Sequence, residues 1–341
     1  MKYYKNCEGC GEKIQTTDIN EKGFSPKEDS LFCQRCFRKE HYGEGENNLE
    51  EFDPHYYLTN ISEAKDEVIM VIDALNPQDT VIKNINKYIK PSKLTLVVNK
   101  VDVFPKSIPD ETIIEWIDNL TMDIDLEFKN IVLLSTYNKK NIDALANYIE
   151  SSENSFSIIG YSNVGKSSLI KALFSAKGEI VNNLVSRTIG TTTKPIELDF
   201  FGTKVTDYPG FILETSMHNQ LTQDQLKIML PEKEINVVNY QLNEGQIVSI
   251  GDLVHFETTK QEENLGYQFM FSNEAEYHRG KKENKDLSEF EKIEINPLQG
   301  AGRQDIIISG IGIITFQNKG QKLTVHLPKG VSVSVVKSIF K

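Results

Sequence analysis

Short apolar runs alternate with segments of helical spacing through the middle of the chain. The runs are rich in β-branched residues and predict buried strands over 68–72, 94–98, 131–134 and 156–159. Apolar residues recur every three or four positions between them and predict helices over 78–90, 109–120, 141–149 and 166–174. This alternation predicts an α/β fold, with a parallel sheet covered on both faces and joined by right-handed crossovers.

The first two of these helices have well-defined apolar positions. In the helix over 78–90 they are Val81, Ile82, Ile85 and Ile89. The helix over 109–120 begins at Pro109, and its apolar face comprises Ile113, Ile114, Ile117 and Leu120.

Beyond about residue 231 the pattern changes to short β-type segments separated by turns, which predicts a β-rich domain over 231–341. We expect strands over 237–242, 246–250, 253–257, 267–271, 292–295, 305–308, 312–316 and 323–326. We expect the charged segment 277–286 to be a mobile loop. Its run from His278 to Lys282 fits either contact with RNA phosphate or a solvated loop.

The composition is that of a globular protein long enough for two or three domains. The chain has 341 residues, 39% of them hydrophobic and 26% charged, with a formal net charge of −11. That charge argues against general attraction to nucleic acid, so any such contact has to be local. With no apolar run near the roughly 20 residues that span a bilayer and no signal peptide, we expect a cytoplasmic monomer with no membrane partner.

All four cysteines lie near the N-terminus, as two Cys-x2-Cys pairs: Cys7 with Cys10, and Cys33 with Cys36. Two such pairs can bring four thiolates together around one Zn²⁺. Disulfides are the alternative, and the absence of a secretion signal disfavours them. We expect a structural zinc finger over 1–45, because four cysteine ligands leave no open position for a catalytic water.

A glycine-rich motif follows the strand over 156–159. It runs Gly160-Tyr161-Ser162-Asn163-Val164-Gly165-Lys166-Ser167 and is followed by Ser168. The backbone N–H groups of such a loop and of the next helix bind phosphates. Lys166 would add positive charge at the β- and γ-phosphates, and the Ser167 hydroxyl would bind Mg²⁺.

A second motif, Asn99-Lys100-Val101-Asp102, follows the strand over 94–98. The Asp102 carboxylate can accept two hydrogen bonds from guanine N1 and N2, which adenine does not offer in that form. This contact would select GTP over ATP, while Asn99 and Lys100 would support the base.

Two further motifs resemble the parts of a GTPase that respond to the γ-phosphate. They are the runs Gly190-Thr191-Thr192 and Asp207-Tyr208-Pro209-Gly210. In the first, Thr192 is our choice for the threonine that reaches Mg²⁺, with Thr191 the alternative. In the second, Asp207 would hold Mg²⁺ through water, and the Gly210 N–H would sense the γ-phosphate.

The order of these motifs is unusual. The guanine motif precedes the phosphate loop, whereas in a Ras-like domain the phosphate loop comes first. We therefore predict a circularly permuted Ras-like P-loop GTPase domain over 60–230, with the motif order G4-G5-G1-G2-G3. The guanine motif and the phosphate loop each follow a strand, so the site survives the permutation, because ligands bind outside the carboxyl ends of parallel strands whatever the chain order.

With these motifs the chain resembles the YqeH family of circularly permuted bacterial GTPases. The resemblance also rests on the two cysteine pairs and on the runs 240–246 and 305–312. It implies a treble-clef-like zinc finger, a GTPase core and a C-terminal domain that binds RNA or protein. It further implies a role in assembly of the small (30S) ribosomal subunit, with rRNA or ribosomal protein as the partner. Ser135 and Thr136 then correspond to the loop that contacts guanine through its backbone.

Two positions bear on the rate of hydrolysis. Phe211 stands where Ras-like enzymes have a water-orienting glutamine, so we expect slow intrinsic hydrolysis that a partner accelerates. Asn163 resembles a residue of potassium-activated GTPases, in which K⁺ supplies charge in the transition state. A loop-stabilising hydrogen bond is the alternative for Asn163.

Two functions remain open. One is a GTP-controlled assembly factor, and the other is a nucleotide-stabilised RNA- or protein-binding scaffold in which hydrolysis is not essential. The C-terminal domain directly follows the switch motif, so we expect its orientation to depend on the bound nucleotide.

Overall fold

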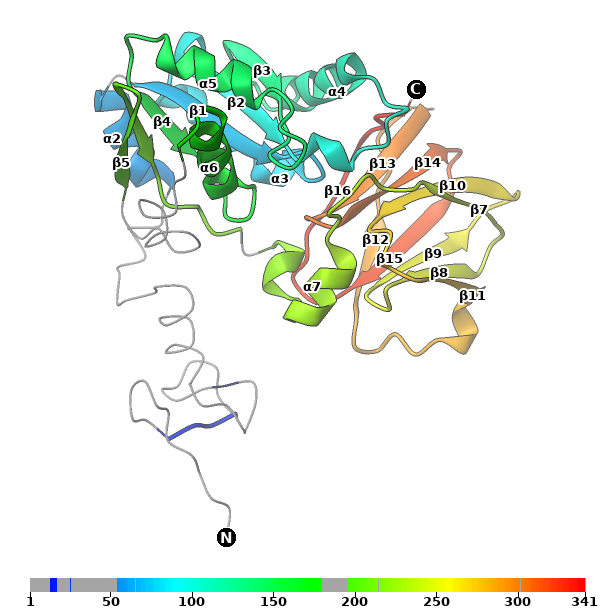
Figure 1. Cartoon of the computed structure of the whole chain (residues 1–341). Helices are drawn as coiled ribbons and strands as arrows, with labels where there is room; N and C mark the ends of the chain where they lie inside the picture. Colours follow the sequence, from blue (N-terminus) through cyan, green and yellow to red (C-terminus); the bar gives the residue numbers. More distant parts are fainter. Residues whose placement is uncertain are drawn as a thin grey trace.

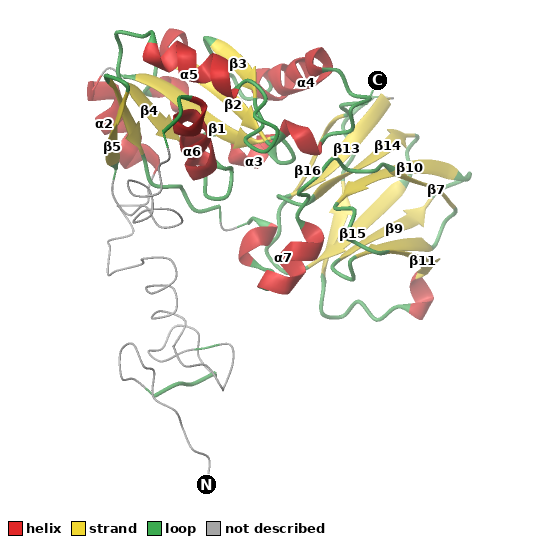
Figure 2. Ribbon diagram, in the orientation of Figure 1, coloured by secondary structure: helices red, strands yellow, loops and turns green. Residues whose placement is uncertain are grey.

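The computed structural model describes residues 13–16, 25, 54–64, 66–179, 195–213, 215–300 and 302–340. These residues form a mixed α/β part followed by a part made mainly of strands (Figure 1; secondary structure in Figure 2). We call the second part the C-terminal β region, residues 238–337. The predicted combination of an α/β fold with a β-rich C-terminal region is thus confirmed.

The α/β part is built on a six-stranded sheet with the order β3-β2-β1-β4-β6-β5. Neighbouring strands are parallel, except that β5 pairs antiparallel with β6. The strands are β1 (Glu67–Asp73), β2 (Leu94–Asn99), β3 (Asn130–Leu133), β4 (Phe156–Ile159), β5 (Ile196–Phe200) and β6 (Thr203–Asp207). Every residue of β1, β2 and β4 is buried, which is why the sequence shows them as continuous apolar runs.

Apolar side chains cover both faces of this sheet. Val68 and Met70 of β1 join a cluster with α2 and α4, whereas Ile69 and Val71 join one with α5 and α6. The helices are α2 (Pro54–Ala64), α3 (Pro77–Thr80), α4 (Asp110–Met122), α5 (Ile142–Glu150), α6 (Lys166–Ala176) and α7 (Gln223–Met229). Short 3₁₀ turns cover Ile85–Lys87, Pro91–Lys93, Val101–Val103, Met217–Asn219 and Lys282–Asn284. Of the helices in the described part, none is long and apolar enough to cross a bilayer.

The helix predicted over 78–90 is wrong. α3 ends at Thr80, because Val81 is extended and Asn84 adopts a left-handed φ of 61°. Asparagine tolerates that conformation and competes with helices through its side chain. The four apolar residues of the segment are nevertheless buried, so the pattern predicted burial correctly and backbone conformation incorrectly.

The apolar face predicted for 109–120 also needs a correction. Ile114 is 38% exposed, and Trp116 is buried instead. The Trp116 ring packs edge-on against Phe104, and its Nε1 donates a hydrogen bond of 2.9 Å to the carbonyl oxygen of Lys337. The burial of Trp116 depends on contact with the C-terminal β region, and the spacing of apolar residues within one helix cannot predict such a contact.

The C-terminal β region consists of two five-stranded antiparallel sheets. Their orders are β16-β13-β14-β10-β7 and β11-β8-β9-β15-β12. A core rich in aromatic residues, including Phe256, Tyr267, Phe269 and Phe316, draws on strands of both sheets. The strands are β7 (Val238–Leu242), β8 (Gln246–Ile250), β9 (Val254–Lys260), β10 (Leu265–Phe271), β11 (Tyr277–Lys281), β12 (Glu291–Ile295), β13 (Gly302–Ile308), β14 (Gly312–Asn318), β15 (Lys322–Leu327) and β16 (Val333–Lys337).

The segment predicted as a mobile loop, 277–286, instead begins with strand β11, which pairs with β8. Its polar residues hid the strand, because an edge strand can expose most of its side chains. His278, Lys281 and Lys282 each lie within 3.6 Å of a glutamate carboxylate. Nearby carboxylates therefore pair with Lys281 and Lys282, whereas Arg279 donates to the Gln246 side-chain oxygen.

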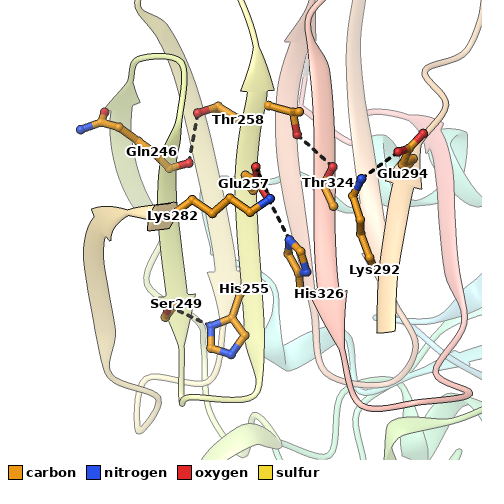
Figure 3. Close-up of polar contacts among 11 residues, drawn as sticks. Gln246, Ser249, His255, Glu257, Thr258, Lys282, Lys292, Glu294, Thr324 and His326 are labelled. Atoms are coloured by element: carbon orange, nitrogen blue, oxygen red, sulfur yellow. Dashed lines mark hydrogen bonds and ion pairs between the residues drawn. The ribbon is translucent and has the colours of Figure 1, made fainter. Parts of the chain in front are cut away.

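Polar side chains of the sheet β11-β8-β9-β15-β12 form hydrogen bonds and ion pairs with one another (Figure 3). They alternate along β9 and β15 with the residues that belong to the core. Glu257 of β9 accepts hydrogen bonds from His326 of β15 at 2.8 Å and from Lys282 at 3.0 Å. Ser249 of β8 shares a 2.8 Å hydrogen bond with Nδ1 of His255. Burial lowers the pKa of His255 to about 4, so this ring is neutral near pH 7.

The two parts of the molecule share one hydrophobic cluster. Phe104 and Trp116 of the α/β part belong to it together with Ile307, Ile313 and Val336 of the C-terminal β region. Burial of such side chains contributes roughly 1.5–3 kcal/mol each. The C-terminal β region is therefore packed against the α/β part and not merely joined to it by the chain.

Candidate functional site

Four of the motifs leave the carboxyl ends of neighbouring parallel strands. Asn99 ends β2, Ser135 follows β3, Gly160 follows β4 and Asp207 ends β6. Carboxyl ends of parallel strands meet at one edge of a sheet, where open α/β folds bind their ligands. The permuted chain order therefore brings these motifs to a common edge.

The guanine motif and the phosphate loop touch each other directly. The Asn99 side-chain amide donates a 2.9 Å hydrogen bond to the carbonyl oxygen of Val164. Gly165 has a φ of 97°, and a Cβ at this position would lie 2.2 Å from that amide nitrogen. Glycine is needed here both for the backbone conformation and for the close approach.

Lys166, the first residue of α6, is folded back on its own loop. Its ammonium donates hydrogen bonds to the carbonyl oxygens of Gly160 at 2.9 Å and Tyr161 at 3.3 Å. Burial lowers the pKa of Lys166 to about 8, and the charge of Asp207 acts in the opposite direction. An anion at this site would favour the charged form of the lysine.

Asp207 has an unsatisfied buried oxygen. Its Oδ1 atom is buried without a hydrogen-bond partner. Burial raises the pKa of Asp207 to about 6, and the nearby charge of Lys166 acts to lower it. Buried polar atoms are normally paired, and an orphaned carboxylate oxygen fits a site for a hydrated cation such as Mg²⁺.

Gly210 closes the other side of the phosphate loop. A Cβ on Gly210 would lie 2.9 Å from the Lys166 ammonium and 2.9 Å from the Ser162 hydroxyl. That hydroxyl donates to the Gly210 carbonyl oxygen at 3.3 Å. The switch motif is thus in contact with the phosphate loop, as the sequence interpretation requires.

The guanine motif has a special backbone conformation. Lys100 has a left-handed φ of 67°, and its ammonium lies 2.5 Å from the Asp73 carboxylate. Asp102 lies in the following 3₁₀ turn and is half-buried. The Val101 N–H donates to the Leu134 carbonyl oxygen at 3.3 Å, which connects this turn to the strand end that carries the next loop.

The loop after β3 is held by a serine. Ser135 is buried, and its hydroxyl accepts hydrogen bonds from the N–H groups of Tyr137 and Asn138, both at 3.2 Å. Thr136 is half-buried, whereas Tyr137 is 77% exposed. This turn shapes the loop from which the sequence interpretation draws a backbone contact with guanine.

The remaining phosphate-loop candidates lie at the surface. Ser162, Asn163 and Ser168 are exposed, and Ser167 is half-buried in the first turn of α6. Asn163 has a left-handed φ of 67°. Asparagine tolerates this conformation, as it does at Asn84.

Phe211 is buried beside the phosphate loop. Its side chain is buried in the shared hydrophobic cluster, where its ring packs against Tyr57 and Tyr161. Its N–H donates to the Gly160 carbonyl oxygen, and its own carbonyl oxygen accepts from the Ser162 N–H at 2.7 Å. This residue therefore contributes packing and backbone contacts.

Some predicted site residues lie outside the described part of the chain. They are the switch I candidates Thr191 and Thr192 and the four cysteines of the predicted zinc finger. Within the described residues, no group of three or more histidine, cysteine, aspartate or glutamate side chains is placed to hold a metal ion.

Sequence reasoning missed Asp73. This carboxylate ends β1 at the position that pairs with Asn99 at the end of β2. The signal was an acidic residue directly after an apolar strand, at the same edge as the motifs. The interpretation of 68–72 as a strand stopped one residue short of it.

Comparisons with known proteins agree with this arrangement. A family model described as "50S ribosome-binding GTPase" matches residues 155–266, and one described as "YqeH-like, C-terminal" matches residues 280–339. YqeH of Bacillus subtilis (strain 168), described as an uncharacterized protein, is 29% identical over 98% of each chain. The comparisons confirm the predicted resemblance to the YqeH family. The matched GTPase model supports a GTP-hydrolysing enzyme at this coarse level, and it implies GTP or GDP and Mg²⁺ as ligands.

More distant matches extend beyond bacteria. NO-associated protein 1, chloroplastic/mitochondrial, of Arabidopsis thaliana is 23% identical over 70% of this chain, which spans 49% of that relative's length. Among solved structures, YjeQ from Thermotoga maritima matches 43% of this chain and 48% of its own, with 24% identity and a TM-score of 0.28.

Proposed function

We propose that this chain is a GTP-binding and GTP-hydrolysing assembly factor for the small (30S) ribosomal subunit. In this proposal its GTP and GDP states differ in affinity for a ribosomal precursor, with rRNA or ribosomal protein as the contact. Support comes from the family and from the shared edge that carries the motifs. The observation that carries the proposal furthest is the buried, unpartnered Asp207 oxygen near Lys166.

Different residues of this edge would bind the guanine base, the phosphates and Mg²⁺. Asp102 would read guanine, Ser135 and Thr136 would add backbone contacts, and the phosphate-loop N–H groups with Lys166 would hold the phosphates. Asp207, Ser167 and Thr192 would hold Mg²⁺, which when bound supplies positive charge to the phosphates. The Gly210 N–H would report the γ-phosphate to the segment that follows.

Slow intrinsic hydrolysis is part of the proposal. A side chain that orients the attacking water has to reach the γ-phosphate, and the Phe211 ring is buried among Tyr57 and Tyr161. We infer that a partner, or a K⁺ ion bound near Asn163, assists hydrolysis in place of the water-orienting side chain that position 211 lacks. Equal turnover in potassium and sodium would exclude the cation.

We also propose three functional units. They are a zinc finger over 1–45 with Cys7, Cys10, Cys33 and Cys36 as ligands, a permuted GTPase domain over 60–230 and a binding domain over 231–341. The zinc assignment predicts one equivalent of zinc in the purified protein, and loss of that zinc when Cys33 and Cys36 are replaced by serine.

The test is cosedimentation with ribosomal particles from a strain whose own copy of the gene is deleted. We expect the protein to move with immature 30S particles in the presence of a non-hydrolysable GTP analogue and to leave them with GDP. One family model is described as 50S-binding, so the 50S fractions are measured in the same gradient. Exclusive movement with 50S particles would overturn the choice of subunit.

The scaffold alternative has its own outcome. Lys166→Ala removes the charge expected at the phosphates, so an assembly factor that needs the GTP cycle should fail to restore 30S maturation. Restoration by this variant would favour the scaffold over the assembly GTPase.

A further inference from the structure

The guanine motif contains an ion pair that the motif itself does not explain. The Lys100 ammonium lies 2.5 Å from Oδ2 of Asp73 at the end of β1. The Asp73 side chain is only 6% exposed, and that of Lys100 is 31% exposed. A nearly buried carboxylate therefore fixes one end of a lysine that sits in the guanine motif.

Asp73 is itself held firmly. Its Oδ1 accepts a 2.9 Å hydrogen bond from the Leu75 N–H, and its own N–H donates to the Thr80 hydroxyl at 3.0 Å. That hydroxyl donates in turn to the Asn76 carbonyl oxygen at 2.6 Å. The carboxylate is thus oriented by its local turn before any ligand arrives.

Fixing a lysine side chain costs rotamer freedom. Where Asp73 already holds the ammonium, the four-carbon stem of Lys100 loses little more on binding a base. We propose that Asp73 is a positioning residue for guanine-nucleotide binding, which acts by holding Lys100 in place. This inference rests on the proposed function, because it requires the guanine motif to bind guanine.

The same turn is anchored from the C-terminal β region. The Asn76 side-chain amide donates to the Ser309 hydroxyl at 2.8 Å, between residues 233 positions apart. The Ser309 carbonyl oxygen accepts from the N–H of Met217, a few residues after Gly210. Ser309 therefore joins the Asp73 turn to the segment that follows the switch motif.

The experiment measures the dissociation rate of a fluorescent GDP from the full-length protein. We expect Asp73→Asn to raise that rate about tenfold, because it weakens a charge-assisted hydrogen bond to Lys100. Glu150→Gln is the matched control, since it alters another lysine–carboxylate pair, with Lys177, outside the nucleotide edge. It should leave the rate unchanged.

A double-mutant cycle separates positioning from a general structural effect. Lys100→Ala should raise the rate by itself, and adding Asp73→Asn to it should change the rate less than about twofold. An equal tenfold effect in both backgrounds, or slower dissociation in Asp73→Asn, would overturn the proposal.

A second variant covers the case in which Asp73→Asn fails to fold. Ser309→Ala should raise the rate about threefold through the Asn76 turn, and this effect should also vanish in the Lys100→Ala background. Its control is Ser334→Ala, because the Ser334 hydroxyl has no hydrogen-bond partner. If Ser309→Ala behaves like its control, the link from the C-terminal β region is wrong.

The wild-type measurement distinguishes failure of the proposed function from failure of the inference about Asp73. A wild-type protein that does not bind GDP would contradict the proposed function. A wild-type protein that binds GDP and is unaffected by Asp73→Asn or Ser309→Ala would contradict only the present inference.

Discussion

Two buried aspartates, one in each part of the molecule, share an electrostatic property and differ in their partners. Burial raises the pKa of Asp207 at the nucleotide edge and the pKa of Asp305 in the C-terminal β region, in both cases to about 6. Asp305 Oδ1 accepts hydrogen bonds from the hydroxyls of Thr315 and Ser338, and its Oδ2 accepts one from the Ile339 N–H. Asp207 Oδ1 has no partner.

The difference teaches which observation identifies a site. A raised pKa alone would mark both aspartates, although the bonds of Asp305 tie the end of the chain to β13. That end carries Ile339, which is buried in the cluster shared with Trp116 of α4. The missing hydrogen bond at Oδ1 distinguishes the proposed binding group, Asp207, from the structural one, Asp305.

The largest effect is expected at Asp207. We predict that Asp207→Ala lowers Mg²⁺-dependent GTP hydrolysis by at least about 100-fold, because it removes a group that would hold the cation. The urea midpoint of the unliganded protein should stay the same or rise, since a buried carboxylate without a partner is removed. A large fall in the midpoint would place Asp207 with Asp305 as a structural group.

Asp305→Ala should show the opposite profile. Three donors lose their acceptor, so we expect about 2–3 kcal/mol less free energy of unfolding in urea. GDP affinity should change little in the fraction that remains folded. The comparison would fail if this variant lost hydrolysis while keeping its stability.

The pH dependence of stability should distinguish the two carboxylates again. Both have a pKa raised from 3.8 to about 6, so the folded chain binds more protons than the unfolded chain between these values. Their contribution to stability is full below about pH 4 and is lost as pH rises through about 6, by roughly 3 kcal/mol for each group.

Ligand should remove only one of these contributions. Bound Mg²⁺ and GDP would hold Asp207 deprotonated, so its part of the pH dependence should disappear while that of Asp305 remains. Urea titrations between pH 4 and pH 7, with and without Mg²⁺ and GDP, measure this difference. Identical pH profiles in both conditions would contradict the assignment of Asp207 as a cation ligand.

The sequence predicted the parts of this molecule that depend on local pattern. Buried parallel strands appear in the sequence as apolar runs, and the ends of the predicted strands then located Asn99 and Gly160 at one edge. The predicted strand over 156–159 coincides with β4. The positions of these motifs follow from strand direction, which is independent of chain order.

Features that depend on contacts between distant segments were not predicted. β16 lies against β13 and was not anticipated, and β11 was taken for a loop because its side chains are mostly exposed. The hydrogen bond from the Asn76 side chain to the Ser309 hydroxyl joins the two parts of the molecule, and no local sequence pattern predicts it. Asp73 was missed because its partner, Lys100, comes from a different strand end.

The smallest effect concerns paired carboxylates on one sheet. Glu257 is nearly buried, and although burial acts to raise its pKa, hydrogen bonds from His326 and Lys282 keep the pKa of Glu257 below its ordinary value. We predict that Glu257→Gln lowers the free energy of unfolding by about 1.5 kcal/mol, because two donors lose a charged acceptor.

Glu294→Gln, which alters the exposed pair with Lys292 (Figure 3), is the control for this prediction and should leave the urea midpoint unchanged. Neither variant should change GDP dissociation, because the partners of Glu257 and Glu294 lie in this sheet or directly beside it. Faster GDP dissociation in Glu257→Gln would show that satisfied polar groups of the C-terminal β region also influence the nucleotide edge, and the contrast between Asp207 and Asp305 would then be one of degree.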